Sequence, residues 1–326
     1  MTTLCHHAVW RLRMRLCVVA CVTTVVCGAH RCPGLDVAGL TNPVWEASYN
    51  LRDPAVLKTD AGYVVFYTRY VGGDWGKVES WSVAAASTKD FRTFTGDRDV
   101  TAKGFASPGD PIRWKGRHIL PYQSYPRNPT RLCYSASDDA RTWTGPEFFL
   151  PEANKLGWNK LGRAIDPSLV VDGNTLHCFF VGSRRIKGGH ANLLGHAVTR
   201  DKNLENWKIL TPDKPLIGIS ERAPDGVENV AVFKTGKRWT MIYSEAMRTQ
   251  HLAYAQSADL IHWTLKGPID LPVQKWMAKR YGAPFVWKEP DGWVMILMGQ
   301  RHDGKTTFGL LTSADGVHWP LLPERK

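Results

Sequence analysis

The chain has 326 residues, of which 43% are hydrophobic and 22% are charged. This composition is that of a globular protein and excludes an intrinsically disordered chain and a disulfide-stapled mini-protein. The formal charge of +12 suggests an anionic partner, and the 14 tryptophans are many for a soluble domain, so they must be packed or bind something.

The N-terminus has the three parts of a secretory signal over residues 1–29. Three arginines precede an apolar run over residues 16–28, and residues 27–29 are small, as a cleavage site requires. Because the run is too short to span a bilayer, we predict no membrane span and a secreted or periplasmic protein. A signal anchor is one alternative, and a lipoprotein, suggested by the Val-Val-Ala-Cys of residues 18–21, is another.

Removal of this leader would leave a charge of +9 and three cysteines, Cys32, Cys133 and Cys178. At most one disulfide can form, so the fold does not depend on a cystine framework. Whether Cys133 or Cys178 pairs with Cys32 is open at this stage. Both lie in apolar strand-like runs, which predicts buried and inert thiols, and the cysteine spacing resembles no zinc site.

After a short N-terminal linker over residues 30–42, five hairpins are predicted. Each consists of a β-rich run, a turn with Gly, Asp, Asn or Lys, and a second β-rich run. The paired runs are 51–57 with 63–68, 110–114 with 118–122, 165–171 with 176–181, 227–233 with 239–243, and 281–287 with 293–298. No stretch has a helical period of useful length.

A second repeat follows each hairpin. It is a Ser- or Thr-rich turn containing Asp, followed by an aromatic residue that begins the next strand. The five copies are Ser87 to Phe94, Ser137 to Trp143, Thr199 to Trp207, Ser257 to Trp263 and Ser313 to Trp319. Five units of ~57 residues over residues 43–326 predict an all-β protein, a five-bladed β-propeller. A six-bladed propeller and a β-sandwich are the alternatives.

Acidic residues recur where the first strand of a unit begins: Asp53, Asp110, Asp166 and Glu228, with Ala283 in the fifth unit. The first strands of a propeller line the central channel, so these four carboxyl groups should converge there. An Asp before Pro also starts turns, which is the structural alternative for each one taken singly. Together they suit glycoside hydrolysis, which needs one carboxylate to act on water and one carboxylic acid to protonate the leaving oxygen.

Three of these motifs resemble those of glycoside hydrolase family 43: Asn-Leu-Arg-Asp-Pro-Ala-Val around Asp53, Ala-Ile-Asp-Pro-Ser-Leu around Asp166, and Gly-Val-Glu-Asn around Glu228. The resemblance implies an inverting hydrolase in which Asp53 is the general base, Glu228 is the general acid, and Asp166 tunes the pKa of that acid. It also implies that Asp110 borders the site.

Two departures from the family pattern limit what the resemblance implies. Residues 280–284 lack the histidine that many members place beside a metal ion, so we expect no metal and no other cofactor. Glu228 is followed by Asn-Val rather than Gly-Pro, which weakens the inference about substrate. The default expectation is a plant- or algal-type polysaccharide or oligosaccharide.

Other residues suggest how a sugar would be held. Trp75, Trp158 and Trp276 lie in irregular stretches, where they would either stack on a sugar or pack within loops. Four arginines flank the first strands or their hairpins and would recognise a uronate or sulfate, or else lie on the solvated surface: Arg163, Arg184, Arg185 and Arg280. The expected substrate-binding set is therefore Asp110, Arg184, Trp75 and Arg280, and the expected partner is a carbohydrate, with an anionic one suggested by the charge.

Nucleic acid is not an expected partner, because the basic residues are spread along the chain. Three rival functions stay open: a mannoside-type phosphorylase on the same fold, a non-catalytic carbohydrate-binding propeller, and a sialidase, which would need six blades.

Overall fold

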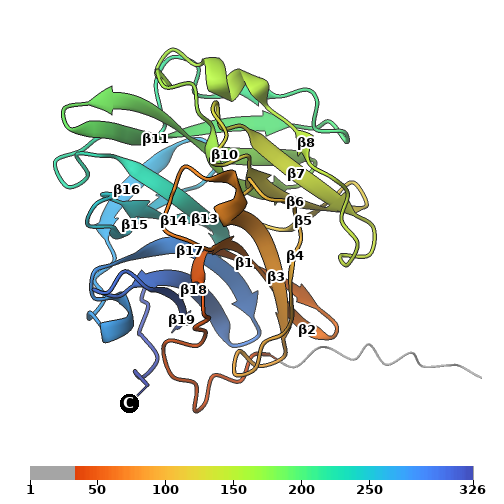
Figure 1. Ribbon diagram of the computed structural model, residues 1–326. Helices are drawn as coiled ribbons and strands as arrows, with labels where there is room; N and C mark the ends of the chain where they lie inside the picture. The colour runs from red at the N-terminus through yellow and green to blue at the C-terminus, as the bar shows by residue number, and fades with distance from the viewer. Residues whose placement is uncertain (1–33, 326) are drawn as a thin grey trace, which may run out of the picture. The chain divides into compact units, whose positions relative to one another are not determined.

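The computed structural model describes residues 34–325, so the predicted signal, the lipoprotein motif and Cys32 lie outside the described residues. The described residues form five antiparallel sheets, with no helix other than three short 3-10 turns (Figure 1). Within every sheet each strand pairs with the next along the chain. The all-β, five-bladed propeller is thereby confirmed, and the six-bladed propeller and the sandwich are excluded.

Blade 1 contains β1 (Asn50–Thr59), β2 (Gly62–Tyr70), β3 (Trp81–Thr88) and β4 (Thr95–Asp99); blade 2 contains β5 (Ile112–Trp114), β6 (Arg117–Gln123), β7 (Leu132–Ser137) and β8 (Glu147–Phe148); blade 3 contains β9 (Ile165–Asp172), β10 (Thr175–Ile186), β11 (Gly189–Thr199) and β12 (Lys208–Ile209); blade 4 contains β13 (Val227–Thr235), β14 (Arg238–Glu245), β15 (His251–Ser257) and β16 (Trp263–Pro268); blade 5 contains β17 (Arg280–Glu289), β18 (Gly292–Gln300) and β19 (Thr306–Ser313). The 3-10 turns are η1 (Val78–Ser80), η2 (Pro151–Lys155) and η3 (Lys275–Met277). The first two strands of each blade are the predicted hairpins.

The repeated turns and aromatic residues join the blades. In the turn of blade 2, Asp139 Oδ1 accepts the backbone N–H groups of Arg141 and Thr142, and these bonds lower the pKa of Asp139 to about 2. Each repeated aromatic packs on a ring of the preceding blade or of its edge segment: Phe94 on Trp45, Trp143 on Phe66, Trp207 on Phe149, Trp263 on Phe179 and Trp319 on Phe233. Most of the unusual tryptophan content is therefore structural.

Both ends of the described chain complete blade 5, which lies beside blade 1 in Figure 1. Asn42, the last residue of the predicted linker, is buried and bonds through its side-chain amide to both backbone groups of Leu310 on β19 (2.9 and 2.8 Å). Its own backbone pairs with Pro323 and Arg325 near the C-terminus. One residue thus joins the N-terminal segment, the C-terminal segment and the edge of the last sheet.

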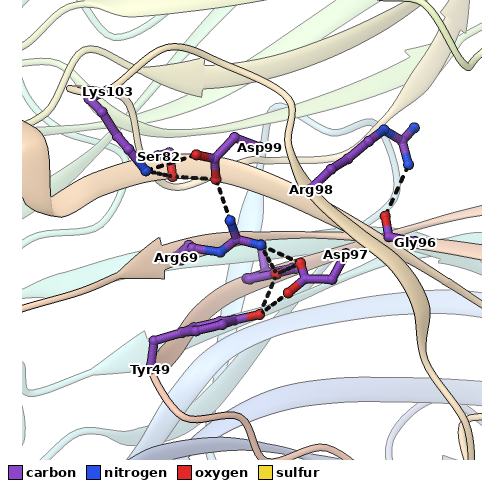
Figure 2. A network of polar contacts seen from close by, with 9 residues as sticks. Tyr49, Arg69, Ser82, Gly96, Asp97, Arg98, Asp99 and Lys103 are labelled. Carbon is purple, nitrogen blue, oxygen red and sulfur yellow. Dashed lines mark hydrogen bonds and ion pairs between the residues drawn. The ribbon is translucent and has the colours of Figure 1, made fainter.

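A network of polar side chains, the blade-1 network, joins strands within blade 1 (Figure 2). Arg69 on β2 forms ion pairs with Asp97 and Asp99 on β4, the latter at 2.7 Å. Asp99 also binds Lys103 at 2.8 Å, and Tyr49 donates to Asp97. The charges of Arg69, Asp97, Asp99 and Lys103 are therefore each matched by an opposite one. These contacts attach β4, which is exposed along its length, to the rest of the blade.

The two described cysteines lie inside strands. Cys133 on β7 and Cys178 on β10 are buried and free, and burial raises the pKa of Cys133 to about 12. Burial raises the pKa of Cys178 as well, so neither thiol forms a thiolate near neutral pH.

Candidate active site

The first strands are distorted at the same place in several blades. The pairing of β1 with β2 shifts between Arg52 and Ala55, and that of β13 with β14 shifts between Glu228 and Val230. One residue at the equivalent place in each blade has a positive φ: Asp53, Asp166, Asn229 and Ala283 in blades 1, 3, 4 and 5, and Ser107, which precedes β5, in blade 2. In a regular strand successive side chains point to opposite faces, whereas these bulges turn two consecutive residues to the same side.

This pattern corrects two features of the predicted register. The blade-2 counterpart of Asp53 and Asp166 is Ser107, three residues before Asp110. In blade 4 the counterpart is Asn229, and Glu228 stands one residue earlier. Sequence comparison of the units aligned Asp-Pro with Asp-Pro, but the shared feature is the left-handed residue, which in blade 2 is a serine followed by Pro108.

The bulges bring the three predicted catalytic residues into one cavity of ≈ 320 Å³, to which blades 1, 3 and 4 contribute Asp53, Asp166 and Glu228. Pairs of consecutive residues line it together, such as Arg52 with Asp53 and Glu228 with Asn229. Larger hollows of ≈ 690 and ≈ 890 Å³ lie among outer strands and turns, and none of these three carboxyl groups lines them.

Asp53 is held by hydroxyl groups. Its Oδ2 accepts hydrogen bonds from Thr68 Oγ1 (2.9 Å) and Ser107 Oγ (3.2 Å), and the backbone N–H of Ser107 in turn donates to Thr68 Oγ1 (2.6 Å). Among the described residues Oδ1 has no partner. Asp53 as a whole is 8% exposed and lines the cavity. One carboxylate oxygen is therefore fixed by neutral donors, and the other is available to a molecule in the cavity.

Glu228 is held by two amides. Asn192 Nδ2 on β11 donates to Oε2 (2.8 Å), and Gln250 Nε2 donates to Oε1 (2.7 Å). Gly226, with φ +86°, lets the chain before β13 approach closely, since a Cβ there would lie 1.8 Å from the carbonyl oxygen of Asn192. Burial, and next the negative charge of Asp53, raise the pKa of Glu228, while the bond from Asn192 acts in the opposite direction.

Asp166 interacts electrostatically with both of the other acids. Its backbone N–H donates to Gln123 Oε1 (2.6 Å), which fixes the start of β9 against blade 2. Burial raises the pKa of Asp166 well above the ordinary value, and the charges of Glu228 and Asp53 add to this effect. Because Asp166 and Glu228 repel each other, the pair retains a proton to higher pH than an ordinary carboxyl group would.

Two of the four predicted substrate-binding residues line the cavity, and the other two do not. Trp75, which is 45% exposed, and Arg280 line the cavity. Asp110 lines a narrow channel of ≈ 30 Å³ that shares Asp53 and Asp166 with the cavity, and burial raises the pKa of Asp110 to about 6. Arg184 is exposed on β10 and is not among the residues that line the cavity.

The other tryptophans singled out from the sequence pack inside the protein. Trp158 donates from its indole to the carbonyl of Thr211 and stacks near Phe180. Trp276 is buried against Gly299 and Gly309, where its ring would collide with any Cβ. Both tryptophans therefore pack within the protein, which was the alternative to stacking on a sugar.

Sequence reasoning missed several residues that line the cavity: Arg52, Trp81, Tyr125, His190, Asn192 and Gln250. A signal existed for Asn192, a polar residue within the apolar run Ala191-Asn192-Leu193-Leu194 of a buried strand. No comparable signal existed for Gln250, which lies outside the strands.

Within residues 34–325 no group of three or more His, Cys, Asp or Glu side chains is arranged to hold a metal ion. No helix in this part of the chain is long and apolar enough to cross a membrane.

Comparison with known proteins supports the fold. No protein-family model matches the sequence, and a search of curated proteins finds no match. Solved structures do match: a protein titled glycoside hydrolase aligns with a TM-score of 0.68 at 14% identity, over 86% of this chain and 92% of its own. A thermostable family-43 glycoside hydrolase aligns with a TM-score of 0.66 at 14% identity, over 88% of this chain and 98% of its own.

A third match is a family-43 β-xylosidase/α-arabinofuranosidase from a compost microbial metagenome, solved with xylotriose in a calcium-free form. It aligns with a TM-score of 0.60 at 13% identity, over 87% of this chain and 97% of its own. The fold is therefore that of the five-bladed propellers of family 43, the family whose acidic motifs the sequence resembles.

Proposed function

We propose that the protein is a glycoside hydrolase that inverts the configuration of the anomeric carbon. The observation that carries this proposal is the convergence of Asp53, Asp166 and Glu228 in one cavity, with environments that differ as the reaction requires. Asp53 keeps one oxygen free of protein partners, whereas burial and neighbouring negative charge raise the pKa of Glu228. One group is thereby suited to accept a proton and the other to donate one.

In the proposed reaction Asp53 Oδ1 takes a proton from water as the water oxygen bonds to the anomeric carbon. Glu228 gives its proton to the glycosidic oxygen as the bond from that oxygen to the anomeric carbon breaks on the opposite face. Asp166 does not exchange protons with substrate in this scheme. Repulsion between the two carboxyl groups keeps one proton on the Asp166–Glu228 pair, and in this scheme Glu228 holds that proton. Trp75, which is 45% exposed, and Tyr125 line the cavity and offer rings on which a sugar can stack, and the buried Trp81 packs against both of them.

The substrate is proposed to be a plant- or algal-type glycan, and the predicted leader over residues 1–29 leads us to propose export. The test is incubation of the purified protein with aryl α-L-arabinofuranoside, β-xyloside, β-galactoside and oligosaccharides, with the product anomer followed by NMR. Turnover with the inverted anomer as first product is expected. A first product of retained configuration would overturn the mechanism, and sugar binding without cleavage would favour the non-catalytic propeller.

Phosphorolysis is the second candidate, because guanidinium groups that could bind phosphate line the same cavity. Asp53 argues against it, since a carboxylate at the place of the attacking group would repel phosphate. Turnover that requires added phosphate and releases a sugar phosphate would establish this candidate instead.

A further inference from the structure

Three arginines line the cavity, and none of them forms an ion pair with a described residue. Arg52 places its guanidinium 4.8 Å above the ring of Trp75, and Arg163 donates from Nη1 to His190 Nε2 (3.3 Å). Across the described residues neither forms an ion pair, although three carboxyl groups line the same cavity. Arg280 is engaged differently, by Gln300 Oε1 (2.6 Å) and the carbonyl of Met247 (3.0 Å).

The backbone that carries these two arginines is fixed. Arg52 stands at the bulge of β1, immediately before Asp53. The carbonyl of Arg163 accepts a bond from the buried amide of Asn159 (2.8 Å), and the next residue donates to the carbonyl of Thr130 (2.9 Å). The backbone of both residues is therefore fixed, and the contacts with Trp75 and His190 orient the two guanidinium groups.

The acids of the cavity do not account for the positive charges of Arg52 and Arg163. Both arginines lower the pKa of Glu228, which works against a group that must stay protonated. His190 adds no charge near neutral pH, because burial and Arg163 lower its pKa. Because the Asp166–Glu228 pair retains a proton, at most two carboxylates face three guanidinium groups, so the cavity has an excess of positive charge.

We propose that Arg52 and Arg163 bind an anionic substituent of the glycan substrate, a carboxylate or a sulfate ester. Both groups present oxygens that a planar guanidinium can bind through two parallel hydrogen bonds. The inference rests on the proposed glycoside hydrolase function, which supplies the sugar that carries the anion. Trp75 has two roles in this arrangement, since it lies in reach of the sugar and supports Arg52.

The test measures binding separately from turnover. Calorimetry would use Glu228→Gln, which prevents cleavage and matches the uncharged state of a protonated Glu228. The probes are matched pairs: an aldouronic xylo-oligosaccharide with its carboxyl-reduced form, and a sulfated galacto-oligosaccharide with its desulfated form. We expect the charged member of at least one pair to bind about 10- to 100-fold more tightly, with the preference decreasing as salt is raised.

Variants in the same background locate the effect. Arg52→Gln with Arg163→Gln should remove the preference, whereas the two Lys substitutions should retain part of it because the charge stays and the planar fork is lost. Arg238→Gln, at the turn-side end of β14, is the matched control and should leave the preference unchanged. Circular dichroism would verify that each variant is folded.

Each outcome decides a different question. Equal or undetectable binding of both members of every pair, or a preference that survives the double Gln substitution, overturns the inference. Inorganic phosphate that competes for these arginines and is required for cleavage overturns a glycan-borne anion as well. A charge preference without any hydrolysis by the unsubstituted protein would leave the inference standing and the proposed function refuted. Hydrolysis without a charge preference would do the reverse.

Discussion

Arginines meet carboxylates in two regions of this propeller, and the two regions treat them in opposite ways. In the blade-1 network Arg69 pairs directly with Asp97 and Asp99 (Figure 2). In the cavity Arg52 and Arg163 have no ion pair, and the acids bind neutral amides and hydroxyls. Charges that stabilise a fold are neutralised within it, whereas charges in the cavity remain available to a ligand.

The largest expected effect comes from removing the reacting groups of the cavity. Glu228→Gln deletes the transferable proton and Asp53→Asn deletes the proton acceptor, so each should reduce kcat by about 10²- to 10⁴-fold. Steady-state kinetics on the best substrate of the sugar screen, together with circular dichroism, would measure this. Unchanged activity in either folded variant would refute the assigned roles.

The next experiment substitutes one arginine in each of the two regions. Arg69→Gln leaves Asp97 and Asp99 without their main partner, and because these acids are about one third exposed we expect a loss of only ~1–2 kcal/mol in the free energy of unfolding. Activity should not change. Arg52→Gln should do the opposite, lowering kcat/KM on a charged substrate with little effect on stability. Denaturant unfolding and kinetics of both variants would measure the contrast, and equal losses of stability would show that the two regions do not differ in this way.

A smaller effect of opposite sign is expected for Asp166→Asn. The pKa of Asp166 is higher in the folded protein than in the unfolded chain, so ionisation of Asp166 favours unfolding. Asp166 therefore costs the folded protein no stability below the unfolded pKa, and the cost grows as the pH rises from the unfolded pKa to the folded pKa. Replacing Asp166 should therefore raise the melting temperature near neutral pH by ~2 °C.

The same variant should move the pH profile of kcat/KM. Loss of the negative charge beside Glu228 lowers the pKa of the acid, so activity should decline at a pH about 0.5–1 unit lower on the alkaline side. Asn192→Ala removes a bond that lowers the pKa of Glu228 and should shift that side the other way. Shifts of the same sign in both variants would contradict the assignment of Glu228 as the acid.

The sequence predicted the fold well because the propeller is a repetition of local features. Hairpins and Asp-containing turns are specified by residues close together in the chain, and each turn aromatic contacts the neighbouring blade. The five hairpins could therefore be read in order, and the acids of blades 1, 3 and 4 could be placed near one channel.

What the sequence did not predict depends on contacts between distant residues. In blade 2 the position equivalent to Asp53 is occupied by Ser107 and not by an acid. This equivalence rests on a shared positive φ, which cannot be predicted from the residue type. Asn192 and Gln250 reach Glu228 from another blade and from a loop. Arg184 was selected because it follows a hairpin strand, but its side chain is exposed on β10, outside the cavity lining.

The smallest expected effect isolates the neutral donors that hold the base. Ser107→Ala removes one of two hydroxyl bonds to Asp53 Oδ2 and keeps the backbone, since Ala283 already has φ 50° at the equivalent place in blade 5. We expect kcat to fall about three- to tenfold with KM unchanged, because the hydroxyl orients the carboxylate and does not contact the sugar.

Thr68→Val is the companion variant, and its effect should be larger. Thr68 both donates to Asp53 and accepts the backbone N–H of Ser107, so its loss leaves a buried donor unsatisfied and should lower stability as well as kcat. If Ser107→Ala raised KM instead of lowering kcat, the Ser107 hydroxyl would contact the substrate. It would then be a binding group, like the arginines of the cavity, and not a group that orients Asp53.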